Sequence, residues 1–160
     1  MSQESINYNL SMNTNYRFEI HDNDAGMFNY FIQDAVIPGL TMSGVEMSYQ
    51  SDQVFMPSNR IDYDPFNGNF LVDEDFNNYL FLYKWMHKIK EADYPKQHFR
   101  DATLYIFSNN KSYNLSVKFY GIFPTSLGDI SFMSNTLSTE PNLCSASFLY
   151  EWFEIKKDIA

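Results

Sequence analysis

Residues 70–90 read FLVDEDFNNYLFLYKWMHKIK, and this stretch decides the fold. Its pattern predicts a helix over residues 73–90. Asp73 stands at the expected N-cap, because its short carboxylate can accept a free backbone N–H of the first turn. Glu74 and Asp75 follow at the positive end of the helix dipole. The basic side chains gather near the negative end: Lys84, His87, Lys88 and Lys90.

Apolar residues cover most of this predicted helix. Helical spacing places one group of them on a single face: Phe76, Tyr79, Leu80, Tyr83 and Met86. A second group widens that face: Phe81, Leu82, Trp85 and Ile89. A helix this apolar must be covered on more than one side. We therefore expect one side to pack on a β-sheet of its own chain and the other to meet a neighbouring copy.

Composition favours a β-rich, interacting protein of one domain. The chain has 160 residues, enough for a real core, and 18% of them are aromatic. Aromatic side chains favour strands and interfaces. The net charge of −9 argues against a nucleic-acid binder that grips phosphates, although it leaves open an acidic wall past which DNA slides.

Cysteine content and hydropathy bear on the compartment. Cys144 is the one cysteine, so an intrachain disulfide is impossible, and its apolar alternating surroundings predict a small buried side chain. No apolar run reaches the length of a membrane span, and the polar N-terminus lacks a signal-peptide pattern. We expect the chain to fold in a cytoplasm, without a membrane partner.

Alternating patterns predict a mainly β fold after a polar, flexible arm at residues 1–14. Residues 15–20 form a half-buried strand in this interpretation, and residues 27–36 form a second strand that completes a hairpin. The other predicted strands are 61–72 with a kink at Pro65, 102–107, 113–120, 130–133 and 143–155. We expect one α+β domain at residues 15–157, a β-sandwich or small barrel with one flanking helix.

Residues 39–60 have no clear period, although they are rich in methionine and other apolar residues. A segment of this length inside a compact domain is usually functional or contains hidden structure. It is either an extended contact surface or an ordinary hairpin packed on its own core. As a contact surface, it would use Met42, Val45, Met47, Tyr49, Val54 and Phe55.

The sequence contains no constellation that indicates catalysis. His21, His87 and His98 lack metal-ligand spacing, and glycine is too scarce for a phosphate-cradling loop. Asp22 and Asp24 lack the twelve-residue pattern of a calcium loop. We therefore expect no catalytic residue, no metal site and no cofactor, and we assign Asp73 to helix capping.

Several short motifs resemble the tail-tube superfamily of contractile-tailed bacteriophages, in the same order. They are DYDP at 62–65, FLVDE at 70–74, YKWM at 83–86, TLYI at 103–106, LSVKFY at 115–120, FPTSL at 123–127 and CSASFLYEWFEIKK at 144–157. The resemblance covers residues 15–157, although residues 39–60 fall outside the matched motifs. Within this superfamily the sequence is most similar to the tail completion and sheath stabiliser proteins, or tail-tube terminators.

This resemblance implies a virion protein of the phage tail, assembled in the host cytoplasm. Copies would form a hexameric ring with an inner β-barrel around a lumen, through which DNA passes without specific binding. A terminator would cap the tube protein at its head-proximal end and hold sheath and neck proteins. The six residues named in segment 39–60 would then contact the adjacent ring.

Other functions stay open at this point. The main tube protein and the baseplate tube initiator share the same motifs, and they differ from a terminator in copy number and position. A small lipocalin-like ligand binder would need an apolar cavity within a monomer. An enzyme would need the catalytic constellation that the sequence lacks.

Overall fold

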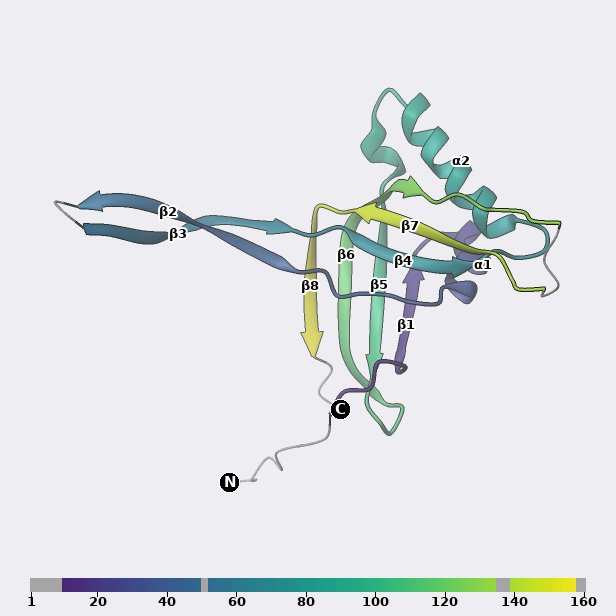
Figure 1. Ribbon diagram of the computed structural model, residues 1–160, viewed down its shortest axis with the longest axis horizontal. Coiled ribbons are helices and arrows are strands. Elements are labelled where there is room, and N and C mark those ends of the chain that lie inside the picture. Colours follow the sequence, from purple (N-terminus) through teal and green to yellow (C-terminus); the bar gives the residue numbers. More distant parts are fainter. Residues whose placement is uncertain (1–9, 50–51, 135–138, 158–160) are drawn as a thin grey trace.

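Two antiparallel β-sheets that share one long strand form the body of the protein (Figure 1). The computed structural model describes residues 10–49, 52–134 and 139–157. In sheet A, β1 (Tyr16–Ile20) pairs with β5 (Arg100–Phe107), β5 with the first half of β6 (Tyr113–Leu127), and β6 with β8 (Trp152–Lys157). In sheet B, the second half of β6 pairs with β7 (Leu143–Leu149), and β7 pairs with β4 (Phe66–Leu71).

The shared strand turns from one sheet to the other at Gly121. This residue has a φ of +65°, and a Cβ there would lie 2.9 Å from Cγ of Glu151. Beside this corner, in the bend between β7 and β8, Glu151 N–H donates to the Tyr120 carbonyl at 2.9 Å. The single strand predicted for residues 143–155 is therefore wrong, because the chain changes sheets within it.

Aromatic rings fill the space between the two sheets. Phe18 of sheet A stacks on Phe66 of sheet B with ring centroids 4.6 Å apart, and Phe119 meets Phe66 edge-on at 5.4 Å. Cys144 of β7 is buried, as predicted, and so are Ala146 and Phe148 on the same face of the strand. β5 and β6, which contain the strands predicted at residues 102–107 and 113–120, pair antiparallel.

Helix α2 (Asn77–Glu91) covers this core from outside (Figure 1). Leu82 and Trp85 are buried, and the Trp85 indole N–H donates to the His98 carbonyl at 2.7 Å, next to the short 3-10 turn η2 (Pro95–His98). The opposite side remains uncovered, with Leu80 40% and Tyr83 48% exposed. This arrangement provides the inner side that we expected, and among the described residues the outer side has no partner.

The start of α2 differs from the prediction. The helix begins at Asn77, Phe76 is the preceding residue with a φ of 59°, and Glu74 and Asp75 lie in the turn before the first helical residue. The Asp73 carboxylate nevertheless accepts backbone N–H groups of Asn77 at 3.1 Å and Asn78 at 3.0 Å. In return, the Asn78 side chain accepts the Asp73 N–H at 3.3 Å.

The strand predicted for residues 27–36 is wrong. These residues begin within helix α1 (Gly26–Phe31), which follows the 3-10 turn η1 (Asn23–Ala25). Phe28 is buried against Phe70 and Phe148, whereas Tyr30 is 79% exposed, so the segment does not alternate as a strand would. β1 pairs with β5 instead.

The region before β7 also differs, because residues 128–134 have no regular structure where a strand at 130–133 was expected. The described residues form eight strands and two α-helices, against seven strands and one helix in the prediction. The fold is mainly β, as expected, but the sheets formed by the described strands do not close into a barrel. Among the described helices, none combines the length and the apolar content needed to cross a membrane.

Replacing Asp73 with Ala should lower the free energy of unfolding by about 1 kcal/mol, because two N–H groups of the first turn lose their acceptor. Urea unfolding followed by circular dichroism measures this change. Asp75→Ala is the matched control, since Asp75 is exposed and should change stability by less than about 0.5 kcal/mol. Equal effects of the two substitutions would contradict the capping role.

Candidate functional site

A long β-hairpin projects from the body and forms the main candidate contact surface (Figure 1). It consists of β2 (Leu40–Tyr49) and β3 (Asp52–Tyr63), which pair only with each other among the strands that the structure describes. Segment 39–60 is thus a hairpin that extends outward. Residues 61–63 belong to β3, and β4 starts only after Pro65, so the single strand predicted for 61–72 is wrong.

Apolar side chains cover one face of the outer hairpin. Val45 lies directly opposite Met56 and Met47 opposite Val54, and directly opposed residues share a face. These four side chains are between 48% and 53% exposed. A contiguous exposed set of this kind, on a two-stranded ribbon with no second layer, is typical of a surface that a partner covers.

The other residues predicted for this contact occupy different positions on the hairpin. Phe55, which is 67% exposed, lies opposite Glu46 and therefore on the other face. Met42 pairs with Ile61 nearer the body, beyond an irregularity in the register, and Tyr49 pairs with Asp52 next to the tip. Met56 belongs to the apolar face and was not in the predicted set, although it follows Val54 at strand spacing.

The body holds the hairpin at its base. The Tyr63 ring packs against Tyr150 and Phe153, with centroids 5.9 Å and 5.5 Å away. The Tyr150 hydroxyl donates to the Asp64 carbonyl at 2.7 Å, and Asp64 N–H donates to the Gly39 carbonyl at 3.1 Å. Burial, followed by the nearby Asp64 and Tyr63, raises the pKa of Tyr150 to about 12. These contacts set the direction in which the hairpin leaves the body.

The edges of the two sheets form a second candidate surface. The outer edge of β4 is covered, because Gln33 N–H donates to the Asn69 carbonyl at 2.8 Å and the Asp34 carboxylate accepts the Asn69 N–H at 2.6 Å. Sheet A differs: within the described residues, β1 pairs only with β5 and β8 only with β6. Both ends of sheet A are therefore available for pairing with another strand.

The outward face of sheet A carries charges that are paired with one another. The ion pairs are Arg17 with Glu19, Lys118 with Asp101 at 4.0 Å, and Lys156 with Glu154 at 3.3 Å. On neighbouring strands of the same sheet, next to Gly121, the Tyr120 and Trp152 rings stack with centroids 4.2 Å apart. This face is thus nearly neutral, although the whole chain has a net charge of −9.

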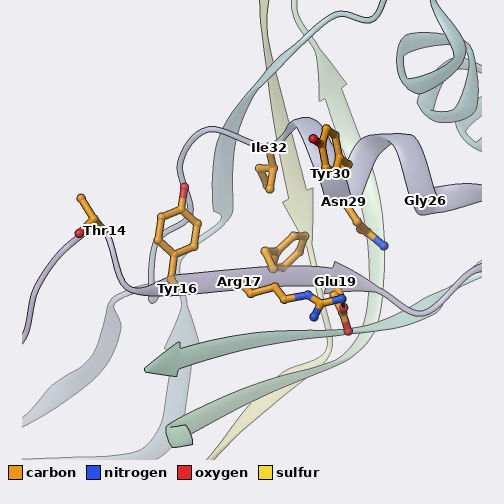
Figure 2. Close-up of a pocket in the computed structure, with 9 residues that line it drawn as sticks. Thr14, Tyr16, Arg17, Glu19, Gly26, Asn29, Tyr30 and Ile32 are labelled. Atoms are coloured by element: carbon orange, nitrogen blue, oxygen red, sulfur yellow. Dashed lines mark ion pairs between the residues drawn. The ribbon is translucent and has the colours of Figure 1, made fainter. Parts of the chain in front are cut away.

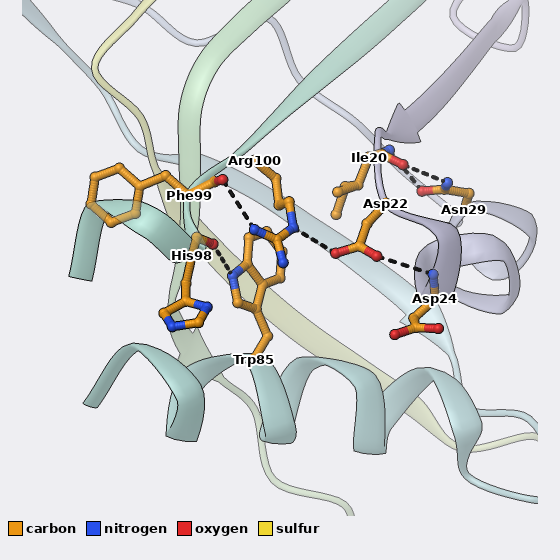
Figure 3. Close-up of polar contacts among 8 residues, drawn as sticks. All are labelled: Ile20, Asp22, Asp24, Asn29, Trp85, His98, Phe99 and Arg100. Atoms are coloured by element: carbon orange, nitrogen blue, oxygen red, sulfur yellow. Dashed lines mark hydrogen bonds and ion pairs between the residues drawn. The ribbon is translucent and has the colours of Figure 1, made fainter. Parts of the chain in front are cut away.

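The polar cluster beside α2 has a structural explanation (Figure 3). Arg100 Nε donates to Asp22 Oδ2 at 2.6 Å, and the Asp24 N–H donates to Asp22 Oδ1 at 3.1 Å. Burial by itself would raise the pKa of the Asp22 carboxyl, but these two hydrogen bonds and the charges of Arg100 and Lys88 lower it overall. The cluster ties the turn after β1 to the start of β5.

The described residues contain no group of three or more His, Cys, Asp and Glu side chains placed to hold a metal ion. The ring nitrogen Nε2 of His21 lies 3.1 Å from the Thr103 hydroxyl. Cys144 is buried, as predicted, and burial raises the pKa of its thiol. The surfaces that the structure offers are suited to binding other chains.

Two solved structures superpose on this chain over nearly their whole length. The anti-feeding prophage tube terminating cap superposes with a TM-score of 0.74 and 14% identity, over 98% of this chain and 97% of that one. The sheath/tube terminator of an extracellular contractile injection system, PVC, gives a TM-score of 0.72 and 13% identity, over 95% of this chain and 99% of that one. At these identities the likeness establishes the fold.

The family model described as phage tail tube protein matches residues 4–156, so the chain belongs to that family. It is also 28% identical to the tail tube terminator protein of Enterobacteria phage T4, over 94% of this chain and 92% of the relative. The family predicted from the motifs is therefore confirmed.

Replacing Tyr150 with Phe should weaken the hairpin base and lower the free energy of unfolding by about 1 kcal/mol at pH 8, because the hydrogen bond to Asp64 is lost. The raised pKa adds a pH dependence. The protonated Tyr150 hydroxyl contributes fully to the free energy of unfolding below the ordinary pKa of 10.0, and this contribution is lost as the pH rises through about 12.

Urea titrations between pH 8 and pH 12 measure both effects. The unmodified protein should lose stability more steeply above pH 10 than Tyr150→Phe does. Tyr94→Phe is the control, since that ring is 72% exposed and should behave like the unmodified protein. Identical slopes for the Tyr150 variant and the unmodified protein would contradict the assignment.

Proposed function

We propose that this protein forms a hexameric ring at the head-proximal end of a contractile phage tail tube. The ring terminates the tube, joins it to sheath and neck proteins, and leaves a central lumen for DNA. It is part of the virion tail and assembles in the host cytoplasm. The similarity to the T4 tail tube terminator over nearly the whole length of both chains favours this role within the family.

The open edges of sheet A are the single observation on which the proposed ring rests. A closed ring of identical subunits needs two different, complementary edges on each copy. β1 and β8 are the two ends of one sheet, and each is paired on one side only among the described residues. Joining β8 of one copy to β1 of the next continues the sheet around the ring and removes both open edges.

The outward face of sheet A then lines the lumen. Its three ion pairs leave little net charge on this face. Phosphates would therefore meet a wall that neither binds them strongly nor repels them strongly. This refines the acidic wall inferred from the net charge of −9, since the excess acidic residues lie elsewhere on the chain.

The hairpin provides the axial contact with the tube. It reaches beyond the body, so its apolar face of Val45, Met47, Val54 and Met56 can meet an adjacent ring (Figure 1). The outer side of α2, with Leu80 and Tyr83 exposed, remains for sheath, neck or a neighbouring copy. The polar arm predicted at residues 1–14 lies largely outside the described residues, and we propose that it also contributes to the stacking of rings.

The main tube protein is the second candidate. A PVC sheath-tube complex superposes with a TM-score of 0.73 and 12% identity, over 96% of this chain and 95% of that one, so the fold alone does not separate the roles. The baseplate initiator stays open for the same reason. A lipocalin-like binder is disfavoured, because stacked rings such as Phe18 and Phe66 occupy the space between the sheets.

Copy number in purified virions tests the role. Quantitative mass spectrometry against the sheath protein should give a single ring of about six copies per tail, because a terminator occupies one layer. Gold labelling of an epitope on the exposed end of η2 should mark one end of the tail, next to the head. A copy number in the range of the sheath protein would instead identify the main tube protein.

Disrupting the apolar face of the hairpin should weaken binding to tube ends. The double substitution Met47→Ser with Val54→Ser removes two opposed apolar side chains, which should weaken binding by about tenfold or more. Sedimentation with purified tubes measures the loss.

Ser48→Ala with Gln53→Ala is the matched control, because this neighbouring pair is opposed on the other face. Both double variants should unfold at the temperature of the unmodified protein, since these side chains are exposed in the subunit. Normal tube binding by the Met47/Val54 variant would show that this face is not the contact.

A further inference from the structure

A groove of about 660 Å³ runs along the outer edge of β1 (Figure 2). Strand β1 forms one wall, with Tyr16, Phe18 and Glu19, and helix α1 forms the other, with Asn29 and Tyr30. Figure 2 shows the Asn29 side chain at the end of the groove where β1 finishes. The groove is therefore bounded along one side by the edge of sheet A itself.

The ladder between β1 and β5 shows which main-chain groups face this groove. His21 N–H donates to the Asp101 main-chain carbonyl at 2.8 Å, and Phe107 N–H donates to the Asn15 main-chain carbonyl at 2.9 Å. Both contacts continue the β1–β5 register, so odd-numbered residues of β1 bond to β5. The N–H and C=O groups of Tyr16, Phe18 and Ile20 consequently point toward the groove.

Asn29 occupies the last of these three positions. Ile20 N–H donates to Asn29 Oδ1 at 2.8 Å, and Asn29 Nδ2 donates to the Ile20 carbonyl at 3.1 Å (Figure 3). The side-chain amide thus makes the two bonds that a residue of a neighbouring strand would make. Within residues 10–49, 52–134 and 139–157, no group bonds to the main chain of Tyr16 or Phe18 on this side.

We propose that Asn29 is a register stop for the joint between two copies of this chain. A second copy's β8 enters the groove and pairs with β1 at Tyr16 and Phe18, and the amide at Ile20 prevents it from extending further. This inference rests on the proposed ring and specifies how its subunits are joined. Asn29 is a positioning residue, because it acts on the incoming strand by occupying the adjoining pairing position.

The direction of the strands identifies β8 as the occupant. Sheet A is antiparallel throughout, in the order β1, β5, β6 and β8, so β8 runs opposite to β1. Rotation about a ring axis preserves this direction, and β8 of one copy therefore meets β1 of the next as an antiparallel pair. β8 is also the other open end of sheet A in the described part of the chain.

A stop at this position has a specific purpose. A slip by one residue would turn the side chains of the incoming strand to the wrong face, so burial already prevents it. A slip by two residues keeps every side chain on its face, and burial offers little resistance to it. Asn29 excludes that second slip in one direction, because Ile20 has no free main-chain group toward the groove.

Cysteine cross-linking in assembled rings tests the register. Arg17→Cys is combined in turn with Trp152→Cys, Glu154→Cys or Lys156→Cys, whose side chains alternate with the inward-facing Phe153 and Ile155 of β8. Arg17 is a non-hydrogen-bonded position toward the new neighbour, where opposed Cα atoms lie close enough for a disulfide. One of the three pairs should carry at least about tenfold more intersubunit cross-link than the others.

Adding Asn29→Ala should spread the cross-link to the position two residues along β8. Asn23→Ala is the matched control, because that exposed asparagine lies in the adjoining turn and should leave the pattern unchanged. An unchanged single pair with Asn29→Ala, or rings in which none of the three pairs reacts, would overturn the register stop and leave the ring itself intact. Failure of the unmodified chain to form rings would overturn the proposed function.

Hydrogen exchange on the unmodified chain provides a test that does not depend on the stability of a variant. The Ile20 amide should be protected in both free subunits and rings, because Asn29 accepts it in the subunit. The Phe18 amide should exchange quickly in free subunits and slow by about a hundredfold in rings. Protection of Phe18 in the free subunit would mean that the chain's own residues already fill the groove, and that result would overturn the inference.

Discussion

The corner at Gly121 is the constraint on which the rest of the structure depends. One strand, β6, belongs to both sheets, and it can turn between them because Gly121 has a positive φ and no side chain to meet Glu151. The corner brings Phe18 and Phe66 face to face and places Tyr150 at the base of the hairpin. Within the described part of the chain, both edges of sheet A also stay unpaired with a further strand.

Much of this architecture could be predicted where the local pattern and the final contacts agree. The β5–β6 hairpin, the buried side of β7 and the helix after β4 all follow strong periodicity. The split between β7 and β8 could not be read from residues 143–155, because both strands alternate and the break is imposed by the corner in β6. The prediction of a strand at residues 27–36 was wrong for a related reason, because Phe28 is buried by packing against two other strands.

The candidate contact residues could likewise be predicted only in part. Exposed methionine and valine residues in segment 39–60 indicated a contact surface, but the face that each occupies depends on a cross-strand register that no local pattern reveals. The contact of Asn29 with β1 could not be predicted from the sequence either. The Asn29 amide completes the edge of β1 nine residues earlier in the chain, and only the folded geometry brings the two together.

The chain belongs to the phage tail tube protein family, and these features support the proposal that copies of it complete one another's sheet A. The most direct measurement of that claim is an electron cryo-microscopy reconstruction of the intact tail end that contains this chain. The account predicts a closed ring in which sheet A continues from β8 of each copy to β1 of the next, with Lys118 facing the axis. Subunits present singly, or a ring in which the β1 and β8 edges stay unpaired, would contradict it.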